Sequence, residues 1–239
     1  MVGPGRGSAA GSVVVEFEMS YFEKPISNKT PKQVVIPFWV YQQVKSYQWR
    51  SETLELRAMV RDVPPQGADA GKWLKERQRQ YKGSHLDYVT PSGVFSYCND
   101  ASLIRHSGLL CIDLDDVCPV SEVNPVFYDL TPECYNMASS ETDAVEELKH
   151  RLIDDPRFNT VMAFRSPRGN WLKWWLQIDL SVCDHRTWFQ GVRNFLMHSD
   201  YRLSDHQVDK MCANPSRACF LSHDPRVYLR TDLIDNFCI

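Results

Sequence analysis

Two aspartates at the end of an apolar segment are the residues of this sequence best suited to chemistry. The segment IDLDD spans residues 112–116 and continues an apolar stretch that begins near Ser107. Residues i and i+2 of a β-strand point to the same face, so Asp113 and Asp115 would project side by side. Two carboxylates this close repel each other unless a cation lies between them, and their hard oxygen atoms favour Mg²⁺ or Mn²⁺. The alternative is a strand that ends in a solvated acidic loop.

The second candidate is a polar turn, SPRGN at residues 166–170, which lies between two predicted strands. A tight turn exposes backbone N–H groups that suit an anion. Arg168 and Lys173 add positive charge, and the hydroxyl of Ser166 adds a donor. The pattern predicts a site for an anion, and a plain hairpin turn with surface bases is the alternative.

A third group of candidates lies in VDK at residues 208–210 and in the segment 214–225. Asp209 follows an apolar residue and could supply a third carboxylate to a metal. Arg217 and His223 could contact phosphate oxygens. Loop residues that cap and turn the chain are the alternative, and this is the better interpretation for His223 taken alone.

A basic stretch, KWLKERQRQYK at residues 72–82, forms the second half of a predicted helix. A single-stranded template requires positive charge and aromatic surfaces on which bases can stack. The candidate template-binding residues are Trp73, Lys75, Arg77, Arg79, Tyr81 and Lys82. A solvated basic helix face would explain the same pattern.

The elements that must position these residues follow from the apolar pattern. Alternating or continuous apolar runs predict strands, and apolar residues at i, i+3 and i+7 predict helices. The expected strands cover residues 13–19, 34–41, 107–114, 160–164, 172–180, 218–222 and 227–229, with Pro37 confining the second to a sheet edge or a bulge. The expected helices cover residues 52–61, 68–82, 142–154 and 184–198, and residues 117–141 look irregular. Intermingled strands and helices predict the α+β class.

Length and composition exclude several classes of protein. The chain has 239 residues, 43% of them hydrophobic and 24% charged, which argues against disorder and against a fibrous repeat. No apolar run approaches the roughly 20 residues of a membrane helix, and no secretory signal is evident. None of the eight cysteines forms a C-x-x-C pair, so we expect reduced thiols and a cytoplasmic location. Residues 1–12 have the composition of a flexible leader or of an expression-tag remnant.

The net charge of −3 argues weakly against a nucleic-acid enzyme, but its distribution is uneven. Residues 113–155 hold 12 acids and 2 bases, and residues 156–230 hold 11 bases and 6 acids. Residues 42–82 hold 9 bases and 5 acids. An acidic block that includes the aspartate pair therefore lies between two basic stretches.

The order of these motifs resembles a known family. The chain is similar to the catalytic domain of the archaeo-eukaryotic primase-polymerase superfamily in four segments. In chain order they are Gly93-x-Phe95, SGLLCIDLDD, FRSPRGNWLKWWLQI and VDKMCANPSRACFLSHDP. The closer resemblance is to the bacterial and phage branch with VirE N-terminal domains, BT4734-like domains and CRISPR-associated primase-polymerases. It covers roughly residues 50–230.

The resemblance carries over residue by residue. Asp113 and Asp115 match the first motif of the superfamily, and Val208-Asp209 matches the third. The second motif and the arginine that follows the third are matched by Ser166, Gly169, Lys173 and Arg217. The turn departs from the family pattern at two positions: Trp171 stands where the branch usually has a second glycine, and Arg168 stands where it often has a serine. The histidine that other members have in the second motif is absent.

The resemblance implies template-directed nucleotidyl transfer, by a DNA primase or a primer-extending polymerase, with two Mg²⁺ or Mn²⁺ ions. The three aspartates would hold the metals. The triphosphate would be held by Ser166, Arg168, Gly169, Lys173, Arg217 and His223. The implied partners are a single-stranded DNA template, a primer and NTP or dNTP, with a helicase or CRISPR adaptation proteins as further candidates in a bacterium or phage.

The implied fold is a single catalytic domain over residues 13–239. An α/β module over about 13–105 would pack on an RRM-like sheet module over about 106–239. A catalytically silent nucleic-acid-binding module and a metal-dependent nuclease remain the alternatives in function.

Overall fold

The first antiparallel sheet is formed by short strands far apart in the chain. The computed structural model describes residues 17–119, 122–123 and 142–235. The strands of this sheet are β1 (Met19–Phe22), β2 (Gln33–Val35), β3 (Tyr88–Thr90) and β9 (Cys219–Phe220), in the order β2-β1-β3-β9. All neighbouring strands are antiparallel. A C-terminal strand, β9, thus completes a sheet that is otherwise N-terminal.

The second antiparallel sheet carries most of the candidate residues. Its strands are β6 (Leu109–Leu114), β7 (Thr160–Arg165), β8 (Leu172–Gln177) and β10 (Tyr228–Leu229), in the order β10-β7-β8-β6. The predicted hairpin is confirmed, because β7 pairs with β8 across the turn at residues 166–171. The register places Asp113 of β6 opposite Lys173 of β8.

The connectivity of the second sheet is β-α-β-β-α-β. Helix α5 (Ala144–Asp154) lies between β6 and β7 in the chain, and α6 (His185–His198) follows β8. The last strand of the unit is reduced to one antiparallel bridge, Leu114 to Val208, on the free edge of β6. The resulting order agrees with an RRM-like sheet.

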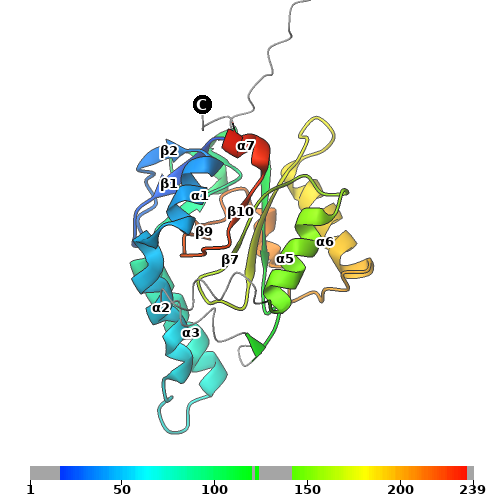
Figure 1. Cartoon of the computed structure of the whole chain (residues 1–239). Helices are drawn as coiled ribbons and strands as arrows, with labels where there is room; N and C mark the ends of the chain where they lie inside the picture. The colour runs from blue at the N-terminus through cyan, green and yellow to red at the C-terminus, as the bar shows by residue number, and fades with distance from the viewer. Residues whose placement is uncertain (1–16, 120–121, 124–141, 236–239) are drawn as a thin grey trace, which may run out of the picture.

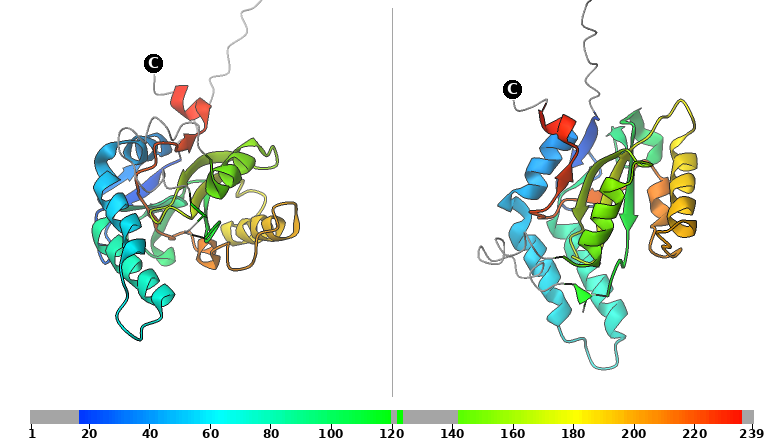
Figure 2. Two further views of the ribbon diagram at one scale, coloured as in Figure 1. Left: turned by 60° about the horizontal axis from the view of Figure 1, so that its bottom comes forward. Right: turned by 45° about the vertical axis from the view of Figure 1, so that its right-hand side comes forward.

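The second sheet is the middle of three layers (Figures 1 and 2). Leu110, Ile112 and Leu114 of β6 contribute to a core with α5 and α6. Leu109 and Cys111 contribute to a second core with the first sheet and α1 (Pro37–Lys45). Alternation along β6 therefore directs Asp113 toward the side of the first sheet.

Both helices on the outer face begin at an aspartate that caps them, in agreement with the predicted boundaries. The side chain of Asp143 accepts hydrogen bonds from the N–H groups of Val145 and Glu146 at the start of α5. Asp184 accepts from Thr187 at the start of α6. Such caps satisfy N–H groups that have no partner within the helix.

One predicted strand is wrong. Residues 34–41 were expected to be extended, but the chain is extended only to Val35, and α1 begins at Pro37. Proline suits the first helical position, because its fixed φ is helical and no donor is needed there. The proline therefore starts a helix where the β-rich composition around it indicated a strand.

Helices α2 (Arg50–Ala58) and α3 (Ala70–His85) form a pair that extends away from the two sheets (Figures 1 and 2). Gln78 of α3 is buried and donates to the carbonyl of Leu56. The remaining named elements are a hairpin of β4 (Gly93–Phe95) and β5 (Leu103–His106), and a C-terminal α7 (Thr231–Asp235). Gly93 is required in that hairpin, since a Cβ there would lie 2.5 Å from the carbonyl oxygen of Arg105.

The predicted leader at residues 1–12 and most of the predicted irregular stretch at 117–141 lie outside the described residues. Within the described part of the chain, no helix is both long and apolar enough to cross a membrane. The expected boundary near residue 105 separates the strands of the two sheets except for β9, which returns to the first sheet.

Two histidines form a hydrogen-bonded chain that predicts a pH-dependent stability. Nε2 of His185 lies 3.1 Å from the carbonyl of Cys212, Nδ1 of His185 lies 3.1 Å from Nε2 of His106, and Gly108 N–H donates to Nδ1 of His106. Every acceptor position is used, so an added proton would break a hydrogen bond. Burial and the neighbouring His185 lower the pKa of His106 to about 4.

Because the unfolded chain takes up this proton near pH 6.5, stability from His106 is present above pH 6.5 and is lost as pH falls toward 4. We expect a loss of about 1 kcal/mol in unfolding free energy from His106 between pH 7.5 and 5.5. Urea unfolding at both pH values, with His106→Asn as the comparison, measures this loss. Equal pH dependence in the two proteins would contradict it.

Candidate functional site

The three predicted metal-binding aspartates are brought together by the bridge at the end of β6. Asp115 N–H donates to the carbonyl of Gln207 over 2.7 Å, and Asp209 N–H donates to the carbonyl of Asp113 over 3.1 Å. These bonds hold the segment around Val208 alongside the end of β6. The carboxylate of Asp113 therefore lies beside that of Asp209, 96 residues further along the chain, and besides burial the charges of both raise the pKa of Asp115.

A cysteine that the sequence analysis did not single out completes the cluster. Asp209 caps a short 3-10 helix over Lys210–Ala213, and its side chain accepts from Met211 N–H. Cys212 of this helix lies beneath β6, where its Sγ accepts from Asp113 N–H over 3.2 Å. Ligand atoms of Asp113, Asp209 and Cys212 all lie within 4.8 Å of one another. No C-x-x-C spacing marks Cys212 in the sequence, so only its place in the fold reveals it.

The donor set fits a hard divalent cation. Oδ1 of Asp113 and Oδ1 of Asp115 are buried and have no hydrogen-bond partner among the described residues. Burial and the neighbouring carboxylate of Asp113 raise the pKa of Asp115 to about 7, against the opposing effect of Lys173. Burial and Asp113 also raise the pKa of the Cys212 thiol. The carboxylate oxygens of the cluster favour Mg²⁺ or Mn²⁺.

Two cations face the aspartates. Nζ of Lys173 lies 2.5 Å from Oδ2 of Asp113, and both side chains are almost fully buried. The guanidinium of Arg217 contacts Asp209 and lies 3.4 Å from Oδ2 of Asp113. Burial alone would raise the pKa of Asp113, but Lys173 and Arg217 bring it below its ordinary value. The structure thus unites the residues predicted for the metal with two of those predicted for the triphosphate.

The turn between β7 and β8 is tight and buried. Gly169 has φ of +93°, in the region that favours glycine, and its N–H donates to the carbonyl of Ser166 over 3.0 Å. The Ser166 N–H donates to the carbonyl of Trp171. Oγ of Ser166 is buried and has no hydrogen-bond partner within the described part of the chain. A buried hydroxyl of this kind can serve a ligand.

The two residues that depart from the family pattern contact each other. The guanidinium of Arg168 lies over the ring of Trp171, 4.4 Å from its centroid, and donates to the carbonyl of Lys75 in α3. The indole N–H of Trp171 donates to Asp116, directly after the aspartate pair. Trp171 therefore lies against Arg168 and ties the turn to the acidic segment.

Helix α3 brings a further cation toward the site. Nζ of Lys82 lies over the ring of Phe220, 4.8 Å from its centroid. Burial and the positive charges of Lys173 and Arg168 lower the pKa of Lys82 to about 7. A depressed lysine pKa of this origin indicates a crowded cationic region, which a bound anion would stabilise.

The other predicted template residues do not all lie on one face of α3. Arg77 contacts Asp62 and stacks over the ring of Trp73, and Arg79 pairs with Glu76. Lys75 is exposed, with Nζ 5.9 Å from the centroid of the Trp171 ring. Tyr81 donates to Glu55 of α2. The structure divides the basic stretch into residues near the turn and residues on the solvent-exposed outer surface.

His223 is not brought to this cluster. Its side chain is fully buried, its Nδ1 lies 2.8 Å from the carbonyl of Ser46, and its N–H donates to Thr53. Burial lowers the pKa of His223. These contacts place it between α1, α2 and the C-terminal segment, so we omit it from the nucleotide site.

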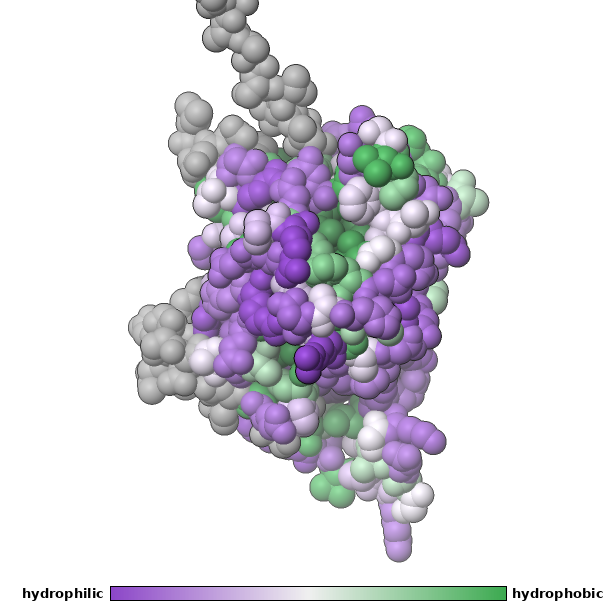
Figure 3. Space-filling model, turned by 90° about the vertical axis from the view of Figure 1, so that its right-hand side faces the viewer, coloured by the Kyte–Doolittle hydropathy of each residue, from purple (hydrophilic) through white to green (hydrophobic). Residues whose placement is uncertain are grey.

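A cavity lies at the ends of β6 and β8 that are farther from the aspartates. It has a volume of about 970 Å³ and lies beside α6, with Ile178, Trp188 and Phe195 among its lining residues. The face of the molecule on the α6 side is largely hydrophilic, with scattered apolar patches (Figure 3). The charged cluster and this cavity are therefore separate features.

Residues 136–229 match the protein family described as BT4734-like, N-terminal domain. The matched region covers less than half of the chain and includes the turn at 166–170, Asp209 and Arg217. It is consistent with the BT4734-like and VirE N-terminal branch that the motifs resemble. No curated protein matches the chain, and no solved structure does.

Proposed function

We propose that this protein is a template-directed nucleotidyltransferase of the primase-polymerase type. The observation that carries the proposal is the convergence of Asp113, Asp115 and Asp209 beside a cluster of lysine and arginine side chains. Carboxylates from more than one element can hold two cations, the arrangement that stabilises the attacking and leaving oxygens in phosphoryl transfer. The resemblance to the archaeo-eukaryotic superfamily and the BT4734-like match support the same function.

The number of cations favours a nucleotidyltransferase over a nuclease. A nuclease acts on a single phosphodiester, whereas a polymerase must hold the three phosphates of its incoming nucleotide. Besides burial, the positive charges of Lys173, Arg168 and Arg217 all lower the pKa of Lys82, which places the four cations in one region. Such a concentration of positive charge exceeds what one phosphodiester requires, and it suits a triphosphate.

The aspartates, Arg217 and the residues of the turn would have different roles in this reaction. The three aspartates would hold Mg²⁺ or Mn²⁺, and these ions would neutralise charge on the reacting phosphate. Arg217, which contacts Asp209 and Asp113, would turn toward the phosphates when metals occupy the carboxylates. Ser166 would offer its hydroxyl at the tight turn that Gly169 allows, with Lys173 beside it.

Lys82 belongs with the nucleotide in this proposal, rather than with the template. Its neighbours Lys173 and Arg168 are residues of the proposed triphosphate site. The outer face of α3, with Trp73, Arg77 and Arg79, remains the proposed template surface. We also propose a DNA template and a primer as partners, with a helicase or CRISPR adaptation proteins as further candidates. A cytoplasmic location is likewise a proposal.

The experiment that tests this function combines unprimed single-stranded DNA, Mn²⁺ and labelled NTPs or dNTPs. We expect products longer than a single nucleotide, and their complete loss after chelation of the metal, because the carboxylates alone cannot neutralise the phosphates. Gel electrophoresis of the products separates the three functions. Shortened template would indicate a nuclease, and binding without new or shortened strands would indicate a silent module.

A further inference from the structure

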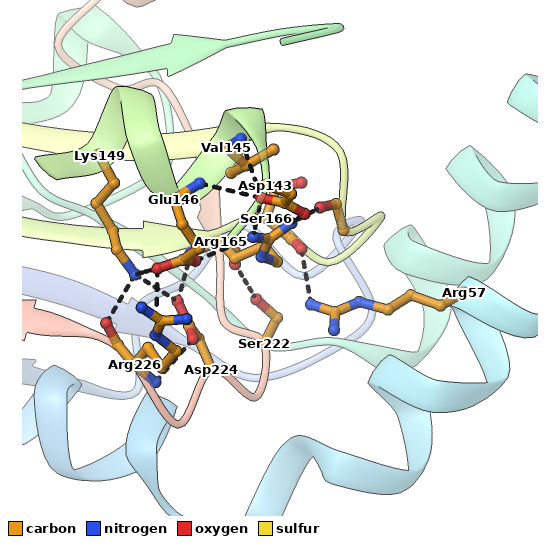
Figure 4. A network of polar contacts seen from close by, with 11 residues as sticks. Arg57, Asp143, Val145, Glu146, Lys149, Arg165, Ser166, Ser222, Asp224 and Arg226 are labelled. Carbon is orange, nitrogen blue, oxygen red and sulfur yellow. Dashed lines mark hydrogen bonds and ion pairs between the residues drawn. The ribbon is translucent and has the colours of Figure 1, made fainter. Parts of the chain in front are cut away.

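A buried ionic network lies directly behind the turn at residues 166–169 (Figure 4). Its charged members come from α5, β7 and the segment after β9. They are Asp143, Glu146, Lys149, Arg165, Asp224 and Arg226, with Arg57 of α2 on the other side of the turn. Buried charges are costly unless they are paired, so a network of this size requires an explanation.

Arg165 connects the network to one end of the turn. Its guanidinium forms ion pairs with Asp143 at 2.7 Å and with Glu146 at 3.0 Å, and it donates to the carbonyl of Gly169 over 2.6 Å. Its backbone N–H donates to Asp224. Both the side chain and the backbone of Arg165 are thereby fixed.

Arg57 holds the other end of the turn. Its Nε donates to the carbonyl of Pro167 and its Nη2 to the carbonyl of Ser166, each over 3.2 Å. The side chain is almost fully buried, and it comes from a helix more than 100 residues away in sequence. Two guanidinium groups therefore bind the carbonyls of Ser166, Pro167 and Gly169.

The contacts of the carbonyls also determine where the N–H groups of the following residues point. In a trans peptide the C=O of one residue and the N–H of the next point in opposite directions. Because the carbonyl of Pro167 points to Arg57, the N–H of Arg168 points away from it. The N–H of Asn170 likewise points away from Arg165. The carbonyl dipoles, which would repel a phosphate, are thereby engaged by the two buried guanidinium groups.

We propose that Arg57 is a positioning residue for nucleotide binding, acting with Arg165 to present the turn at residues 166–169 to the phosphates. This inference rests on the proposed function. Arg57 contacts the carbonyls of Ser166 and Pro167, so we expect its effect to reach the nucleotide through the turn backbone. Nothing near Arg57 in the sequence signals this role.

The test compares Arg57→Met with Arg57→Lys and wild type in primer extension. Loss of two charge-assisted hydrogen bonds to the turn should raise KM for the nucleotide about 10-fold and change kcat less than about 3-fold. Arg57→Lys keeps the charge but has one compact donor group, so its KM should lie between the two. Amide hydrogen exchange at Ser166 and Gly169, without nucleotide, should be faster in Arg57→Met than in wild type.

Lys149→Met is the matched control. Lys149 is as buried as Arg57 and belongs to the same network, but its contacts are Glu146, Asp224 and the carbonyl of Arg226 rather than the turn. We expect this variant to lower the unfolding temperature without raising KM or the exchange at the turn. A KM that rises equally in both variants would overturn the positioning role and assign the effect to general destabilisation.

The remaining outcomes separate this inference from the function on which it rests. Active wild type with unchanged KM and unchanged exchange in Arg57→Met would overturn the positioning role alone. Wild type without any nucleotide-dependent product would overturn the proposed function, and the role of Arg57 with it. If Arg57→Met does not fold, Arg57→Lys carries the comparison, and a wild-type KM in that variant counts against the role.

Discussion

Asp115→Asn is expected to reduce nucleotide incorporation by at least about 100-fold while leaving the protein folded. Substitutions next to metal ligands commonly cost about 10- to 100-fold, so loss of a direct ligand should cost more. The protein should remain folded because none of the ion pairs of the described residues includes Asp115, and burial already raises its pKa to about 7. A neutral isostere there should change unfolding free energy by less than about 1 kcal/mol.

The rate should be measured at saturating Mn²⁺ on a primed template, with urea unfolding on the same preparation. Asp116→Asn is the matched control, because Asp116 is the adjacent carboxylate and contacts Trp171 and Asn170 instead of the other aspartates. It should retain activity within about 10-fold of wild type. Full activity of Asp115→Asn would remove this residue from the metal site.

Asp113→Ala is expected to destabilise the protein by about 3–5 kcal/mol, in contrast to Asp115→Asn. Asp113 and Lys173 form a buried pair at 2.5 Å, with 3% and 5% of their side-chain surfaces exposed. Removing the carboxylate leaves the ammonium of Lys173 buried without its partner. Loss of activity in Asp113→Ala alone is therefore weak evidence for metal binding, because the same change affects the fold.

A double-mutant cycle in urea separates the pair from its surroundings. Lys173→Met should be destabilising, since it removes the shorter of the two ion pairs that Asp113 forms with Lys173 and Arg217. Asp113→Ala with Lys173→Met should be more stable than the sum of the two single changes predicts, because no unpaired charge remains. Additive effects would show that the ion pair contributes little, contrary to its burial.

The elements predicted best from the sequence are those with local signals. The spacing of Val145, Leu148 and Leu152 and the caps at Asp143 and Asp184 identify α5 and α6. The apolar runs around a turn identify β7 and β8. The helix from Pro37 was missed, because β-branched and aromatic residues around the proline outweighed its preference for a first helical position.

The aspartates were found because strand geometry and family resemblance both point to them. The sequence also identified Arg217 and Lys173, although their contacts with Asp113 depend on the pairing of β6 with β8 and on the bridge to Val208. His223 was grouped with these residues by its place in a polar motif, but it is buried against Ser46. Sequence proximity alone therefore did not separate the site from the core behind it.

The contacts of Lys82 and Arg57 could not be predicted from the sequence, because they depend on tertiary packing. Lys82 was assigned to the template because its helix is basic, but its ammonium lies over the ring of Phe220, and burial together with the charges of Lys173 and Arg168 lowers its pKa. Arg57 reaches carbonyls 109 and 110 residues away, a relation set entirely by tertiary structure. No periodicity or local motif could have indicated it.

Template-directed synthesis on a homopolymer tests the central claim most directly. On an oligo(dT) strand with Mn²⁺ and one labelled nucleotide at a time, wild type should incorporate adenine nucleotides and exclude the other three. Asp115→Asn should incorporate none. Equal incorporation of all four nucleotides, or undiminished products from Asp115→Asn, would contradict a template-directed nucleotidyltransferase whose metals are held by these aspartates.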